Sequence, residues 1–67
     1  MAVLKVIEIM ASSKESWEEA AKDAVKSAAK TVKGIRSVYV QDQSAVVKDN
    51  DIVEFRVTCK ISFEVMK

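Results

Sequence analysis

Histidine and proline are absent from this 67-residue sequence, which contains one glycine, Gly34, and one cysteine, Cys59. Without histidine the chain lacks the usual acid/base group at neutral pH and the commonest metal ligand, so most hydrolase and zinc-site chemistries are excluded. A single cysteine forms no internal disulfide, and we therefore expect a protein of the reducing cytoplasm. The scarcity of glycine and proline excludes collagen-like and linker-rich chains.

Long apolar runs and an excess of charge of one sign are also missing. No run approaches the roughly 20 apolar residues that span a bilayer, and the N-terminus lacks the apolar segment of a signal peptide. The formal net charge is +1, so no strong field attracts nucleic acid or an anionic membrane. We expect a soluble, unprocessed protein without those partners. With 49% hydrophobic residues, the chain forms one small domain spanning 1–67.

A helix is predicted after an N-terminal strand. The β-branched-rich stretch 3–10 predicts that strand. Alanine and other apolar residues then recur at helical spacing as far as Val32, so we expect a helix that begins near Lys14 and ends at Gly34 as a left-handed cap. Ser13 is the preferred N-cap, and a capping box formed by Ser12 and Glu15 is the alternative.

Two further strands follow, over 35–47 and 53–65, separated by the polar turn 48–51. The last strand alternates apolar and polar residues throughout, and its apolar set is expected to face the helix. The order is β-α-β-β, which predicts an α+β fold with a three-stranded antiparallel sheet packed on one helix.

One helix is too short to cover the long final strand along its whole length. The uncovered side of the sheet is predicted to carry Tyr39, Thr58 and Met66 among charged residues. Small scaffolds of this kind usually obtain the missing burial by oligomerisation, so we expect a homo-oligomer.

Several stretches resemble the dodecin family over essentially the whole chain: 6–9, Ser13, 16–25, 35–36, 55–57 and 61–63. The resemblance implies a hollow spherical homododecamer with its helices outside and its curved sheets facing inward. It also implies binding and storage of a flavin, such as riboflavin, FMN or FAD, rather than catalysis.

The resemblance also assigns candidate cofactor-binding residues. Ser37 stands where flavin-binding dodecins carry the tryptophan that stacks on the flavin ring, so the stacking contact is missing; Tyr39, two residues on, is a possible substitute ring. Arg56 occupies the position of a glutamine that bonds the ring, and it suits a ring carbonyl or a phosphate. Asp42, followed by Gln43, matches an acidic position of the family.

A second hypothesis keeps the cage but replaces flavin with calcium or with another cofactor such as coenzyme A. Asp42 is the candidate metal ligand, because carboxylate oxygens suit hard cations. Asp49 and Asp51 are interpreted as a solvated hairpin tip, and with Glu54 they match no known calcium loop. A third hypothesis, an enzyme, lacks paired buried carboxylates and a glycine-rich phosphate loop.

Three remaining features are interpreted as structural. Trp17 lies on the apolar stripe of the helix and is expected to pack in the core. Cys59 has core-facing parity and no histidine partner, so we expect a buried, inert thiol. Glu18 and Lys22 are expected to form an i, i+4 ion pair on the wet face of the helix.

Overall fold

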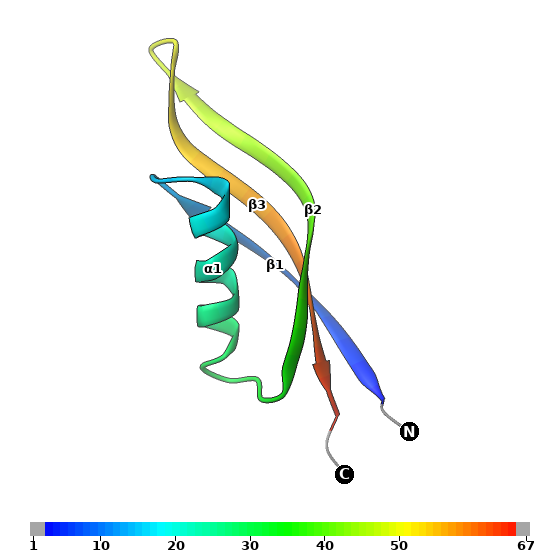
Figure 1. Ribbon diagram of the computed structural model, residues 1–67. Coiled ribbons are helices and arrows are strands. Elements are labelled where there is room, and N and C mark those ends of the chain that lie inside the picture. The colour runs from blue at the N-terminus through cyan, green and yellow to red at the C-terminus, as the bar shows by residue number, and fades with distance from the viewer. Residues whose placement is uncertain (1–2, 66–67) are drawn as a thin grey trace.

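The long alternating strand predicted near the C-terminus, β3 (Asp51–Glu64), forms the centre of the sheet. β1 (Leu4–Ser13) and β2 (Ile35–Lys48) both pair antiparallel with it, in the order β1-β3-β2. The helix α1 (Trp17–Ala28) connects the two outer strands and lies against one face of the sheet (Figure 1). This computed structural model describes residues 3–65, and it confirms the predicted α+β fold.

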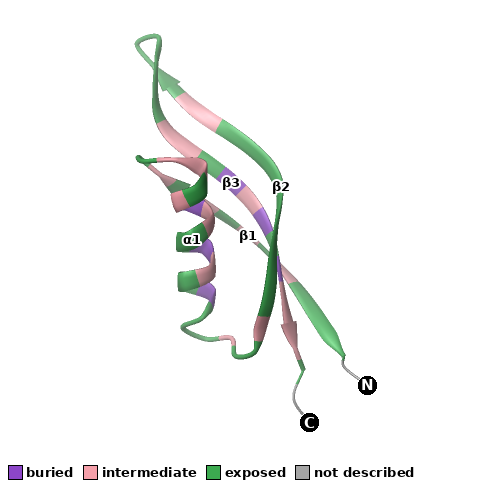
Figure 2. Cartoon of the chain, viewed as in Figure 1, coloured by how far each residue is buried: buried purple, intermediate pink, exposed green. Residues whose placement is uncertain are grey.

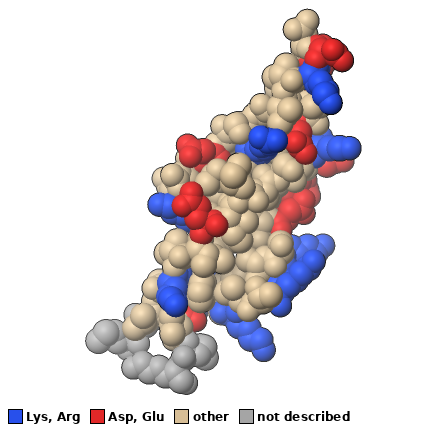
Figure 3. All heavy atoms as spheres, turned by 180° about the vertical axis from the view of Figure 1, so that it is seen from behind, with Lys and Arg blue, Asp and Glu red and all other residues tan. Residues whose placement is uncertain are grey.

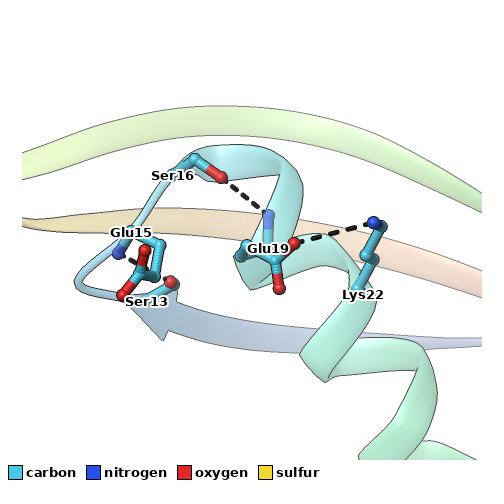
Figure 4. Close-up of polar contacts among 5 residues, drawn as sticks. All are labelled: Ser13, Glu15, Ser16, Glu19 and Lys22. Carbon is cyan, nitrogen blue, oxygen red and sulfur yellow. Dashed lines mark hydrogen bonds and ion pairs between the residues drawn. The ribbon is translucent and has the colours of Figure 1, made fainter.

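The N-terminus of α1 lies later than predicted. Ser16, in extended conformation, is the N-cap, and its hydroxyl accepts a hydrogen bond of 3.0 Å from the Glu19 amide (Figure 4). Ser13 instead ends β1, and its hydroxyl accepts from the Glu15 amide at 2.9 Å. The preference for Ser13 and a start near Lys14 is therefore wrong. Three serines offered the same capping chemistry, and the pairing of β1 with β3 extends that strand through the first two.

The C-terminus of α1 lies earlier than predicted. The helix ends at Ala28, and the amides of Lys30 and Thr31 bond carbonyls three residues back, which is the tighter geometry of a closing turn. Gly34 has the predicted left-handed conformation, with φ +77°, but it does not cap the helix. It precedes β2, where its carbonyl accepts from the Glu64 amide at 2.9 Å. A Cβ at this glycine would lie 3.3 Å from the Glu64 carbonyl oxygen.

The buried core is small and lies between the helix and the middle of β3 (Figure 2). It consists of Ala20, Ala24, Ala28, Val57, Cys59 and Ile61. Alanines allow the helix backbone to approach the sheet, but each buries little apolar area. The prediction that the apolar set of β3 faces the helix is confirmed in the middle of the strand by the burial of Val57, Cys59 and Ile61, whereas Val53 near its start and Val65 just beyond its end are exposed.

The strand boundaries also differ at the hairpin and in β1. β1 continues to Ser13, three residues beyond the predicted end. The β2–β3 hairpin closes through Asp49 and Asn50, whose φ values of 53° and 67° are those of a two-residue primed turn. This geometry matches the right-handed twist of the strands, and it confirms the predicted polar turn.

The chain is elongated, with extents of 51 × 19 × 13 Å and a radius of gyration of 13.7 Å. A globular domain of this length would have a radius near ~11 Å. Large apolar side chains are exposed on all three strands; examples are Val6, Met10, Val38 and Ile52. Over residues 3–65, no helix has the length and apolar character needed to cross a membrane. Because a single chain leaves these apolar side chains exposed to solvent, the structure supports the expectation of an oligomer.

Candidate functional site

The two faces of the sheet have different chemistry because β3 alternates. Val57, Cys59 and Ile61 point toward α1 and are buried. The residues between them, Arg56, Thr58, Lys60 and Ser62, therefore project to the opposite side. We call that side the helix-free face. Cross-strand partners share a face, so the pairing register assigns the residues of β1 and β2 as well.

Ser37 and Tyr39 lie on the helix-free face, opposite Ser62 and Lys60 of β3. The Ser37 and Ser62 hydroxyls share a hydrogen bond. Tyr39 is 65% exposed, and its ring is available to a ligand or to another copy of the chain. This placement confirms that Tyr39 shares the facing of Ser37. Met66, which was also predicted for this side, lies outside the described residues.

A β-bulge in β2 brings Asp42 to the helix-free face. The register shifts between Val40 and Asp42, so that Asp42 pairs with Thr58. Strict alternation from Ser37 would have turned Asp42 toward the helix instead. Gln43 then pairs with Val57 on the helix side. Four of the five candidate residues therefore share one face, and Gln43 lies on the other.

Arg56 lies farther along the same face, between Ser12 of β1 and Ser44 of β2. Its Nε atom is 3.9 Å from Oε1 of Glu54, whose Oε2 accepts a hydrogen bond of 3.3 Å from the Ser12 hydroxyl. A shallow hollow of about 130 Å³ adjoins the guanidinium, lined by Met10, Ala11, Ser12 and Arg56. The remaining donors of Arg56 can bind a carbonyl or phosphate oxygen here.

The acidic residues of one chain do not converge. Asp49 and Asp51 lie at the exposed tip of the hairpin, as predicted, whereas Asp42 lies in the middle of β2. Across residues 3–65, no group of three or more His, Cys, Asp or Glu side chains is placed to hold a metal ion. A calcium site that includes Asp42 therefore needs oxygen atoms from another copy or from water.

Residues outside the predicted set complete the helix-free face. Glu8 of β1 lies opposite Lys60, and Met10 lies opposite Thr58. Alternation within β3 predicted that Lys60 and Thr58 lie on this face. Their partners on β1 depend on the pairing register, which cannot be derived from the sequence pattern. Seen from behind, acidic and basic side chains are interspersed with uncharged surface (Figure 3).

We compared the sequence with models of known protein families. The dodecin family model matches residues 3–66. The chain belongs to the dodecin family. A calcium dodecin of Mycobacterium tuberculosis is 38% identical over 64 residues, which cover 96% of this chain and 90% of that protein.

Solved dodecins share the fold closely. A Thermus thermophilus dodecin variant superposes with a TM-score of 0.94 at 22% identity, with 100% of both chains covered. Streptomyces coelicolor dodecin gives 0.93 at 20% identity, covering 98% of this chain and 94% of that one. The calcium dodecin of M. tuberculosis, described as calcium-chelating with a novel calcium-binding site, gives 0.83 at 36% identity, covering 96% and 91%.

The tryptophan and the cysteine of this dodecin both have structural roles. Trp17 packs edge-on against Phe55, with ring centroids 4.9 Å apart, and its Nε1 donates a hydrogen bond of 2.8 Å to the Ser44 carbonyl. Trp17 is therefore on the helix side of the sheet, partly buried against the core. Cys59 is fully buried, and loss of hydration raises the pKa of its thiol, which disfavours the reactive thiolate.

The surface ion pairs of this dodecin differ from the predicted one. Lys22 pairs with Glu19 at 3.6 Å, an i, i+3 contact, rather than with Glu18 (Figure 4). Arg36 of β2 pairs with Glu64 of β3. The Lys22–Glu19 pair is solvent-exposed and contributes little to stability. In the second pair Arg36 is exposed and Glu64 is partly buried.

Proposed function

We propose that this chain is a non-catalytic dodecin that binds a small cofactor on the helix-free face of a homo-oligomer. The proposal rests on the concentration of Ser37, Tyr39, Asp42 and Arg56 on that face, away from the side chains that form the core. These residues are free to contact a ligand without loss of the packing that holds the helix on the sheet. Family membership supports the same conclusion.

Calcium is the ligand we favour. The bulge in β2 presents the exposed carboxylate of Asp42 beside Thr58, and this is the observation that carries the proposal. Calcium takes about six to eight oxygen ligands in flexible geometry, so carboxylates, hydroxyls and waters from adjoining copies suit it. The calcium dodecin relative, at 38% identity, favours the same ion.

Calorimetric titration of chelator-treated protein with Ca²⁺, and separately with Mg²⁺, tests this proposal. Asp42→Asn removes the charge while preserving the shape, and we expect it to weaken Ca²⁺ binding by about tenfold or more. Asp23→Asn, on the exposed surface of α1, is the matched control and is expected to bind as the parent does. Equal affinity in all three proteins would reject Asp42 as a ligand.

Flavin is the second candidate, and the exposed Tyr39 ring favours it. An aromatic ring on the helix-free face can stack on an isoalloxazine ring, while Arg56 can bind a phosphate of FMN, FAD or coenzyme A. A stacked flavin loses its fluorescence, so titration of riboflavin and FMN reports binding directly. We expect Tyr39→Phe to retain any quenching and Tyr39→Ala to lose it. Quenching that survives Tyr39→Ala would refute the role of this ring.

The assembly is proposed to be a homododecamer. The small core and the exposed apolar residues of all three strands support association of many copies. Light scattering should give one large species even at low concentration, and a monomer peak would reject the proposal. The unpaired, buried thiol of Cys59 supports a reducing location such as the cytoplasm.

A further inference from the structure

Two cationic side chains flank Asp42 on the helix-free face. Asp42 pairs with Thr58 of β3. Arg56 and Lys60 lie two residues to either side of Thr58 on the same strand, and they share its face. They are therefore the diagonal cross-strand neighbours of Asp42, with Cβ atoms roughly 7–8 Å from its own, and long side chains interact across such diagonals. An ion held by the Asp42 carboxylate lies within the field of both cations.

The charge of Arg56 is compensated by a nearby carboxylate. Its Nε atom is 3.9 Å from Oε1 of Glu54, which is the next residue of β3 on the same face. Glu54 lies farther from Asp42 than Arg56 does, but the two opposite charges are close together. Seen from Asp42, this pair therefore presents little net charge.

The charge of Lys60 is compensated less. Among the ion pairs within residues 3–65, none includes Lys60, and its side chain is exposed. Its cross-strand neighbours are Tyr39, which supplies no carboxylate, and Glu8 of β1. Because β3 separates β1 from β2, Glu8 lies one strand farther from Asp42 than Lys60 does. The nearer charge dominates the field at Asp42, and it is positive.

The side chains around Asp42 thus differ in what they offer a divalent cation. The Asp42 carboxylate and the Thr58 hydroxyl are oxygen donors of the kind that calcium takes. Lys60 has three N–H donors and no acceptor, so it is not a calcium ligand. Its effect on a calcium ion at Asp42 is repulsion between two elementary charges and one.

We propose that Lys60 sets the calcium affinity of this face, because its ammonium group opposes a divalent cation at Asp42. The inference rests on the proposed calcium site and adds the residue that limits its affinity. Calcium held in this way is bound weakly, so it is released as its free concentration falls. Such behaviour suits reversible storage of the ion.

Lys60→Gln tests the proposal, because it removes the ammonium charge and keeps a long polar side chain. Calorimetric titration with Ca²⁺ at about 10 mM ionic strength should show binding tighter than that of the parent by about fivefold to tenfold. Lys60→Arg keeps the charge and is expected to bind as the parent does. Lys26→Gln is the matched control: it removes the same charge from the exposed surface of α1, across the sheet, and should leave the affinity unchanged.

Salt separates an effect of charge from an effect of structure. At about 1 M potassium chloride the Debye length is near ~3 Å, which is shorter than the separation of Lys60 from Asp42. The difference in Ca²⁺ affinity between the parent and Lys60→Gln should then disappear. A difference that persists in high salt would show that the substitution acts through structure, and the proposal would be wrong.

The remaining outcomes distinguish this inference from the calcium site itself. Equal affinity of the parent and Lys60→Gln at low salt would reject the role of Lys60 while the site at Asp42 stands. Equal tightening in Lys26→Gln would reject it as well, since only net charge would then matter. Absence of Ca²⁺ binding in every variant would overturn both proposals. Circular dichroism and sedimentation velocity confirm that the variants fold and assemble as the parent does.

Discussion

Introducing an indole at Ser37, the position that the resemblance matches to a stacking tryptophan, is the most direct perturbation of the proposed ligand face. Ser37→Trp places a large ring on the helix-free face, where the parent side chain is exposed and shares a hydrogen bond with Ser62. The neighbouring same-face residue, Tyr39, is about 6.8 Å away along the strand, so the new ring has room beside it. We expect the variant to bind riboflavin more tightly than the parent.

Two contributions decide how far Ser37→Trp changes riboflavin affinity: the added aromatic contact and the lost hydrogen bond to Ser62. An aromatic contact contributes about 0.5–1.5 kcal/mol beyond plain burial, which corresponds to an increase in affinity of about 2- to 12-fold. The lost hydrogen bond between Ser37 and Ser62 costs about 0.5–1.5 kcal/mol, at the low end because water replaces it on an exposed surface. That cost is present with and without ligand, so it lowers the stability of the protein and leaves the affinity unchanged.

Fluorescence titration of riboflavin with ligand-free protein is the assay, because stacking quenches the emission. Ser37→Ala is the control, since it loses the same hydrogen bond and adds no ring. The reasoning predicts tighter binding for Ser37→Trp alone. Superimposable titrations for the parent and both variants would refute it, and would show that the face departs from a flavin site at more than this residue.

Three further predictions concern the fold. Gly34→Ala should lower the free energy of unfolding by about 1–2 kcal/mol in chemical denaturation, because its φ of +77° disfavours an L side chain; an unchanged midpoint would contradict this. Ile61→Ala should cost about 2–5 kcal/mol, since the side chain is fully buried, whereas the exposed neighbour change Lys60→Ala should cost little. Burial raises the pKa of the Cys59 thiol, so the folded state retains its proton better than the unfolded state. The stability from this group is therefore complete below the ordinary thiol pKa near ~8.5 and falls as pH rises through the higher folded value, and the native thiol should resist alkylation until the chain unfolds.

The predicted helix was correct in its existence and wrong at both ends, for reasons that lie outside the helix. Ser13 has good capping chemistry, but its backbone pairs with Phe55 of β3 and so belongs to a strand. The apolar spacing continues past Ala28 to Val32, yet the chain must turn there to reach β2 on the far side of β3. Helix propensity and spacing act locally, whereas these limits come from the sheet.

In the candidate site, too, local alternation predicted some placements and strand pairing determined the others. Ser37, Tyr39 and Arg56 have consistent parity within their strands, so alternation alone predicted their common facing with Thr58. Asp42 and Gln43 exchanged faces because the bulge inserts one residue between them and Tyr39. Nothing in the local sequence marks that bulge, since it depends on how β2 pairs with β3.

Composition and periodicity are sufficient to predict the α+β class, the element order, the alanine contact between helix and sheet, and the buried thiol of Cys59. These features depend on short-range patterns that each element carries along its own length. Pairing decided the rest: the central position of β3, the register that places Glu8 opposite Lys60, and the uncovered surface of β2. Residues far apart in the chain meet only when the strands associate, so the helix-free face and the uncovered surface of β2 are properties of the tertiary structure.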